Sequence, residues 1–85
     1  MSVDLNYTEM NAPAGASWVM IPGLRFRRII QVCRDGVIYD VVNLGAFFYP
    51  PSGSRQVSYY APFGRLAFPT DSVFNSGETL FIKWR

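Results

Sequence analysis

The carboxylates are the main groups in this sequence that could act as acids or bases at neutral pH. They are Asp4, Glu9, Asp35, Asp40, Asp71 and Glu78. Two carboxylates that meet in a cleft can hydrolyse glycosidic bonds, but nothing in the sequence indicates that any two of these converge. Asp35 and Glu78 lie in expected turns, where turn formation and solvation account for them. The sequence contains no histidine, which removes the commonest general base and the commonest neutral metal ligand.

Cysteine chemistry is equally restricted. Cys33 is the only cysteine, so the sequence predicts no internal disulfide and no zinc site built from cysteines. Its neighbours Arg34 and Asp35 carry opposite charges and do not clearly favour the thiolate. No nucleophile elbow, Walker A loop, zincin motif or C-x-x-C pair occurs. We therefore expect a protein that is not an enzyme and that binds no cofactor or metal.

The most unusual stretch is residues 45–54, in which three consecutive aromatic residues precede two prolines. Alternate residues of a strand point to opposite sides, so Phe47, Phe48 and Tyr49 cannot all face one core. Pro50 and Pro51 offer no N–H group and therefore stop strand pairing. One interpretation is the rim of a core capped by a stiff loop. The interpretation favoured here is a hydrophobic anchor for a partner.

A second aromatic group follows at Tyr59 and Tyr60, where by the same argument one ring points inward and one outward. We expect Tyr60, Phe63 and Arg65 to form an outward patch near Pro62. These residues join the loop aromatics as candidate interface residues.

Arginine accounts for seven of the eight basic residues, and the net charge is only +2. Arginine suits interfaces and carboxylate pairing because its guanidinium is planar and weakly hydrated. Arg25, Arg27 and Arg28 are clustered and are further candidate interface residues. Arg28 interrupts an apolar strand face, which indicates a bulge or a side chain that reaches solvent. The functional alternative is an ion pair with a carboxylate such as Asp40 or Asp71 supplied by a neighbouring subunit.

The elements that must position these residues are predicted to be strands. Seven Gly and six Pro interrupt the chain of 85 residues, and short runs of Val, Ile, Tyr and Phe lie between them. The clearest element is a hairpin at Asp35-Gly36, because both residues tolerate the positive φ angles of a type I′ turn. This turn predicts the cross-strand pairs Arg34–Val37, Val32–Tyr39, Gln31–Asp40 and Ile30–Val41.

Alternation along that hairpin predicts one core face. It contains Leu24, Phe26, Ile30, Val32, Tyr39 and Val41. The other face includes Arg25, Arg27, Gln31 and Asp40. Ile29, Ile38 and Val42 also fall on that second face, which is too apolar for open solvent and implies cover from the same chain or a neighbour.

Several further strands are expected around the hairpin. Residues 75–77 form a turn before a strand over residues 79–85, in which Leu80, Ile82 and Trp84 alternate inward and which should close the sheet. Residues 55–61 and 64–68 are two short strands, and residues 18–21 a short extended stretch. Residues 1–10 are a first strand, on the alternation of Val3, Leu5 and Tyr7, or an arm on another subunit, and residues 1–22 as a whole could form an extended arm.

These elements predict one all-β domain over residues 1–85. Its architecture is a single small antiparallel β-sandwich or a partly closed barrel built from hairpins. No signal peptide or membrane span is recognised, because the first residues lack a basic region and the apolar runs are far shorter than a bilayer requires. The lone cysteine fits synthesis in a reducing cytosol.

The sequence ends with FPTDSVFNSGETLFIKWR, residues 68–85, in which a Gly77-Glu78 turn leads into a final apolar strand. This ending resembles the closing hairpin of small β-sandwich structural proteins of tailed bacteriophages. The resemblance covers about the last fifth of the chain and implies no catalytic or binding residue. It does imply a virion protein made in the host cytoplasm, such as a capsid decoration, head–tail joining or tail component.

The amino-acid composition is also consistent with a virion protein of this type. A small aromatic-rich β domain with little charge suits contacts with itself and with other virion proteins in a symmetric homo-oligomer. The alternative is a monomeric binder of single-stranded nucleic acid or of a host protein, with a barrel of the OB or SH3 type. In that case bases would stack on the exposed rings and the arginines would follow the phosphates. No membrane partner is expected.

Overall fold

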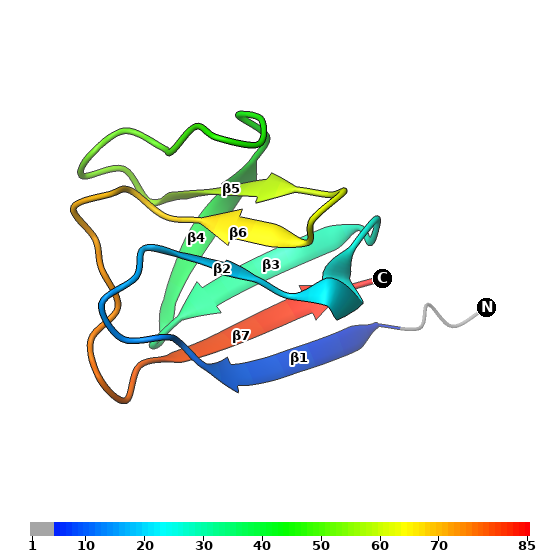
Figure 1. Ribbon diagram of the computed structural model, residues 1–85. Coiled ribbons are helices and arrows are strands. Elements are labelled where there is room, and N and C mark those ends of the chain that lie inside the picture. The colour runs from blue at the N-terminus through cyan, green and yellow to red at the C-terminus, as the bar shows by residue number, and fades with distance from the viewer. Residues whose placement is uncertain (1–4) are drawn as a thin grey trace.

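A computed structural model describes residues 5–85 of the chain, which form seven strands and one short 3₁₀ helix, η1 (Pro22–Leu24) (Figure 1). The strands are β1 (Asn6–Asn11), β2 (Trp18–Met20), β3 (Ile29–Arg34), β4 (Val37–Val42), β5 (Gln56–Tyr60), β6 (Arg65–Ala67) and β7 (Thr79–Trp84). Within residues 5–85 there is no α-helix, and no helix has the length and apolar character to cross a membrane. The predicted all-β class is confirmed.

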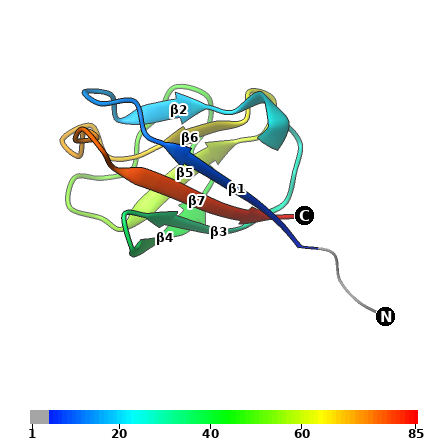
Figure 2. The ribbon, with the colours of Figure 1, turned by 90° about the horizontal axis from the view of Figure 1, so that it is seen from below.

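All seven strands belong to one sheet, with the order β1-β7-β3-β4-β5-β6-β2. Neighbouring strands are antiparallel except for β4 and β5, which run parallel. The sheet is curled into a half-barrel, as the view from below in Figure 2 shows. Of the two closures left open by the sequence, the partly closed barrel therefore describes the fold. Because parallel neighbours need a crossover, a long connection over residues 43–55 joins β4 to β5.

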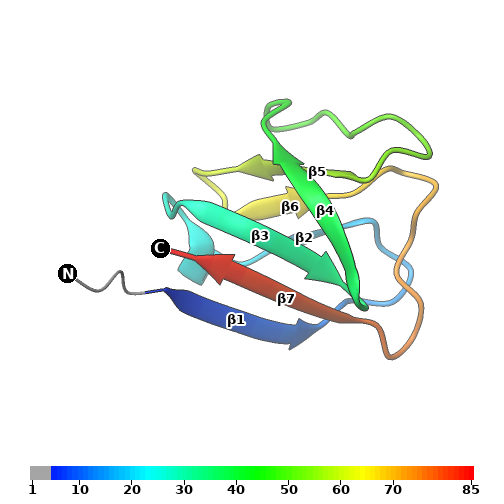
Figure 3. The same ribbon diagram turned by 180° about the vertical axis from the view of Figure 1, so that it is seen from behind.

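The β3–β4 hairpin has the predicted turn. Asp35 and Gly36 both adopt positive φ angles, of 48° and 85°, and Val32 lies opposite Tyr39. The ladder stops there, so the further predicted pairs Gln31–Asp40 and Ile30–Val41 are not formed. Asp40 pairs instead with Gln56 as β4 turns away from β3 towards β5 (Figure 3).

A bulge in β3 changes which residues reach the core. The register between β3 and β7 shifts between Ile29 and Gln31. As a result Ile29 packs against the core, whereas Ile30 is 41% exposed. The bulge predicted at Arg28 thus lies slightly further along the chain.

The predicted core face is therefore only partly right. Leu24 and Val32 are fully buried, and Tyr39 and Val41 pack against the core. Phe26 was placed on the same face but is exposed, because it follows η1 in a left-handed conformation with φ of 58°. The second face was expected to be covered; residues 5–85 do not cover Ile38, which is 56% exposed, whereas Ile29 of that face packs against the core.

The strand β7 is formed as predicted, with Leu80 and Ile82 fully buried and Trp84 packed against the core. It does not close the sheet, however, because it lies between β1 and β3. The first strand, β1, takes the outer position, and the Trp84 indole donates a hydrogen bond to Thr8 of β1 at 2.9 Å. Val3 and Asp4 lie outside the described residues.

The core fills the concave side of the curled sheet. Its buried apolar members are Ala12, Val19, Leu24, Val32, Val57, Leu66, Phe68, Phe74, Leu80 and Ile82. The rings of Phe68 and Phe74 meet edge to face at 5.3 Å, an arrangement that aromatic quadrupoles favour. Phe74 also exchanges backbone hydrogen bonds with the β1–β2 connection, at Gly15 and Ala16. This connection therefore holds the long loop before β7 over one end of the core.

Candidate binding site

The β4–β5 connection, residues 43–55, is fixed at its start by two side chains. The buried Ser58 hydroxyl accepts a hydrogen bond from the Leu44 N–H at 3.1 Å. The Asn43 side-chain carbonyl accepts one from the Gly45 N–H at 3.0 Å, and Gly45 has a φ of 96° that favours glycine. The loop therefore leaves β4 in a defined direction.

The same loop brings the predicted aromatic residues to the surface. Phe47 is 83% exposed and Phe48 is 67% exposed, whereas Tyr49 is half-buried and Pro50 is buried. The prediction that at least one of these rings reaches a surface is confirmed. Because burying a phenylalanine side chain is worth about 1.5–3 kcal/mol, leaving two of them in water forgoes a substantial gain.

A surface hollow of about 260 Å³ lies where this loop meets the edge of the sheet. It is lined by Trp18, Met20, Ala46, Phe47, Tyr49, Phe63 and Arg65. Strand β2 alternates around buried Val19, which directs its two flanking residues outward into the hollow. The opposite wall comes from the loop, and the base comes from β6, which pairs with β2.

Arg65 supplies the only charge in that lining. Its side chain is 8% exposed, and its guanidinium carbon lies 5.5 Å from the centre of the Trp18 ring and 5.0 Å from that of Tyr49. The Nη1 atom donates a hydrogen bond to the Ala46 carbonyl at 2.8 Å. Attraction between a cation and the faces of aromatic rings stabilises such an arrangement. Arg65 was expected to point outward, but it forms the base of the hollow instead.

A second hollow, of about 360 Å³, adjoins the first and shares Met20 and Phe63 with it. Pro22, Arg25 and Pro62 complete its lining. The two hollows thus form one continuous surface that joins β2 to the β5–β6 turn, with an arginine in each half.

The predicted patch near Pro62 is present in part. The rings of Tyr60 and Phe63 meet edge to face, with their centres 5.0 Å apart. Phe63 is 44% exposed and lines both hollows, whereas Tyr60 is only half-buried and lines neither. Phe63 is therefore the member of this pair that reaches the candidate site.

The arginine cluster does not act as one surface. Arg25, Arg27 and Arg28 are all exposed, but only Arg25 lines a hollow. The Arg27 guanidinium lies over the Trp84 ring at 5.1 Å, and the Arg28 backbone exchanges hydrogen bonds with Arg85. None of the three forms an ion pair with a carboxylate of residues 5–85.

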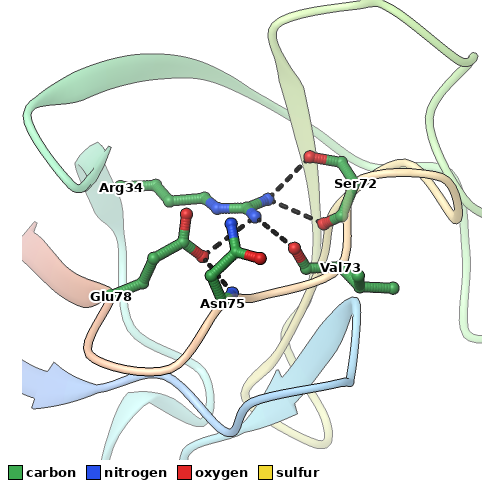
Figure 4. A network of polar contacts seen from close by, with 5 residues as sticks. All are labelled: Arg34, Ser72, Val73, Asn75 and Glu78. Carbon is green, nitrogen blue, oxygen red and sulfur yellow. Dashed lines mark hydrogen bonds and ion pairs between the residues drawn. The ribbon is translucent and has the colours of Figure 1, made fainter.

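One buried polar network was missed at the sequence level (Figure 4). Arg34, only 6% exposed, donates to the Ser72 carbonyl and hydroxyl, to the Val73 carbonyl and to the Glu78 carboxylate, at 2.8–3.0 Å. Glu78 also accepts a hydrogen bond from the Asn75 N–H at 3.0 Å, so it is a partly buried ion-pair partner and not merely a solvated turn residue. The available signal was the alternation that places Arg34 on the same face as Val32, where a cation needs a partner. This network holds the loop before β7.

Tyr59 fixes the segment between η1 and β3 in a similar way. Its hydroxyl contacts the carbonyl groups of Leu24 and Arg27 and accepts a hydrogen bond from the Arg27 N–H at 3.1 Å. Burial raises the pKa of the Tyr59 hydroxyl, while the Arg27 backbone and charge act in the opposite direction. This segment carries Arg25 at the second hollow.

Acidic groups can form a metal site or a two-carboxylate site where they lie close together. Within residues 5–85 no three Cys, Asp or Glu residues lie together as a metal site would require. A polar hollow of about 310 Å³ includes Asp71, Arg55 and Tyr39, with the Asp71 carboxylate accepting a hydrogen bond from Ser52. Asp71 is its only carboxylate, so this hollow lacks the acid–base pair that hydrolysis by two carboxylates needs.

No protein-family model, no curated protein and no solved structure matches this chain.

Proposed function

We propose that this chain is a non-enzymatic structural or accessory protein of a bacteriophage virion, which acts through protein–protein contacts in a symmetric assembly. Its role in the virion is capsid decoration, head–tail joining or that of a tail component. The virion part of the proposal rests on the resemblance of residues 68–85. The interaction part rests on the surface around the β4–β5 connection.

The observation that supports the interaction part is the exposure of Phe47, which lines the first hollow, and of its chain neighbour Phe48. Together with Trp18, Met20 and Phe63, each at least 39% exposed, they give one region of the molecule a strongly apolar surface. Contiguous exposed apolar surface on a small protein is typical of an interaction site. Trp, Tyr and Arg, which all line the first hollow, are the residues that most often dominate interface energetics.

The proposal is tested by the native mass of the purified protein, measured by light scattering over a wide range of concentrations. We expect a discrete closed oligomer, such as a trimer, pentamer, hexamer or larger ring. Phe48→Asp should raise the dissociation constant of that oligomer at least about 10-fold, since truncating a central interface residue costs more than about 1 kcal/mol.

The matched control is Val73→Asp, which introduces the same charge at a residue that is 46% exposed on a different loop. It should leave the oligomer unchanged, and circular dichroism should show that both variants keep the fold. Unchanged assembly of Phe48→Asp, or a wild-type protein that stays monomeric at about 1 mM, would contradict self-assembly through this surface.

A second function is favoured by one feature, the presence of Arg25 and Arg65 along the same aromatic surface. Single-stranded nucleic acid binds to surfaces that combine stacking rings with cations. In that case affinity for an oligonucleotide should fall steeply as salt rises, and replacing Arg25, Arg27 and Arg28 with Gln should remove it. Apolar protein contacts would tolerate the same salt.

A further inference from the structure

Arg34 and Arg65 are both nearly buried, but only one of them has its charge balanced within the described chain. Arg34 is 6% exposed and pairs with Glu78, with further hydrogen bonds to Ser72 and Val73. Arg65 is 8% exposed, and within residues 5–85 its single hydrogen bond goes to the Ala46 carbonyl. No described carboxylate lies within 4.0 Å of its guanidinium.

The remaining side-chain donors of Arg65 have no hydrogen-bond partner among residues 5–85. Every fully buried side-chain nitrogen or oxygen in residues 5–85 has a hydrogen-bond partner. The Nε and Nη2 atoms have none among these residues, so they must reach solvent. Arg65 itself lines the hollow, together with Phe47, Trp18 and Tyr49. Because a poorly hydrated charge is costly unless paired, this position favours an anion.

We propose that this hollow is an anchor site for a carboxylate that a partner protein presents beside an aromatic or large apolar side chain. The carboxylate would accept hydrogen bonds from the free edge of Arg65, and the apolar group would pack on Phe47 and Trp18. A planar guanidinium held between two rings is already oriented for such a bond, so little conformational freedom is lost on binding. The inference rests on the proposed function in taking the partner to be a protein.

The size and charge of the hollow favour a protein side chain over other anions. Its volume of about 260 Å³ is below the roughly 300–1,000 Å³ typical of small-molecule pockets. Arg65 is the only cation in its lining, whereas nucleic acid engages a series of cations along its phosphates. One carboxylate with one adjoining apolar group matches what the hollow offers.

The probes are 3-phenylpropionate and its uncharged counterpart 3-phenylpropanamide, titrated into ¹⁵N-labelled protein and followed by NMR. The Trp18 indole N–H and the Arg65 Nε–H report on the hollow directly. We expect saturable shifts of both signals with the carboxylate, and binding at least about 10-fold weaker with the amide, because the charge-assisted hydrogen bond is lost.

Two sets of variants separate binding from folding. Arg65→Gln should abolish the preference for the carboxylate over the amide. Should that variant fail to fold, Phe47→Ser gives an independent test, because Phe47 is 83% exposed and lines the hollow. It should weaken both probes several-fold, whereas Ile38→Ser, at an exposed apolar residue of β4 outside that lining, should leave both affinities unchanged.

Equal affinity for the two probes, or shifts confined to residues outside the hollow, would overturn the anchor site. If an oligothymidylate of eight nucleotides displaces 3-phenylpropionate and binds more tightly than it does, the hollow is a nucleic-acid site instead. These outcomes are independent of the light-scattering test. An oligomer that forms while the probes fail would leave the proposed function standing and remove only the anchor site.

Discussion

At the scale of single residues, the Arg34–Glu78 ion pair is the clearest polar contact outside the apolar core. The Arg34–Glu78 pair is shielded from solvent, with the two side chains 6% and 15% exposed. Both partners also contact the loop before β7, through Ser72, Val73 and Asn75. A buried ion pair adds little to the stability of the folded protein compared with apolar residues of the same shape. Removing one of its charges is nevertheless strongly destabilising, because the other charge stays buried without a partner. The pair therefore ties the loop to the end of β3.

Glu78→Gln tests this point. The amide keeps the size of the side chain and can still accept hydrogen bonds, but Arg34 loses its counter-charge. We expect the free energy of unfolding to fall by about 2 kcal/mol, as for hydrogen bonds to charged groups. Urea denaturation at constant m-value measures the change. The control Glu9→Gln, at an exposed position of β1, should change stability by less than about 0.5 kcal/mol. Similar effects of the two variants would contradict this account.

Tyr59 gives a pH-dependent prediction. Burial raises the pKa of its hydroxyl, so the folded protein keeps a proton that the unfolded chain releases. Its contribution to stability is therefore present below about pH 10 and is lost as pH rises beyond that value. Tyr59→Phe should lower stability near neutral pH by about 1 kcal/mol, through loss of the hydroxyl contacts with Leu24 and Arg27.

The same variant should lose less stability than the wild type between pH 8 and pH 11, which thermal unfolding across that range measures. The other four tyrosines are present in both proteins, so their contributions cancel in the comparison. Identical alkaline slopes for the two proteins would count against a buried, protonated Tyr59 hydroxyl.

At the residue scale, exposure of the loop aromatics could be predicted and burial of Arg65 could not. Three consecutive rings cannot share one face, whatever the fold. The position of Arg65 depends on the pairing of β6 with β2 and on the path of the β4–β5 connection. Both are long-range features that no local sequence pattern specifies.

At the scale of elements, the backbone of the β5–β6 turn closely approaches the chain before η1. Gly64 has a φ of 62°, and its carbonyl accepts a hydrogen bond from the Ile21 N–H at 2.9 Å. A Cβ atom at this position would overlap the Ile21 carbonyl. This contact fixes the segment that supplies Met20 and Arg25 to the candidate site.

Gly64→Ala should therefore cost about 3 kcal/mol or more, because strain at a positive φ adds to a clash with backbone. Gly23→Ala is the matched control, since its Cβ would meet nothing within 4 Å and its φ is not positive. It should be close to neutral. Thermal unfolding of both variants measures the difference, and comparable midpoints would show that the approach at Gly64 relaxes easily.

Elements whose partners are close in the sequence could be predicted, and those whose partners are far apart could not. The β3–β4 hairpin is local, and Asp35-Gly36 specifies it through the backbone angles of its turn. The bulge near Ile30 was placed wrongly because it depends on the register with β7, far along the chain. The parallel β4–β5 pair has no local signal either, since its partners are separated by the long connection.

At the scale of the whole molecule, the protein carries little net charge. The chain carries a net charge of only +2, so repulsion between copies is weak and salt should alter their association little. The rings that line the first hollow come from β2, the β4–β5 connection and the β5–β6 turn, whereas the Arg34–Glu78 network and the aromatic core stabilise the fold elsewhere. Substitutions at Phe47 and Phe48 should therefore affect contacts with partners far more than they affect folding.

The position of β7 between β1 and β3 also governs the order in which the molecule can fold. Asn6 of β1 pairs with Trp84 of β7, so nearly the whole described chain must close into a loop before that ladder forms. Topologies with such distant pairings fold slowly, on the order of milliseconds to seconds. While the chain is being synthesised, β1 and β3 each have an open edge until β7 arrives. The nascent chain is therefore most prone to wrong pairing in the interval just before its last strand emerges.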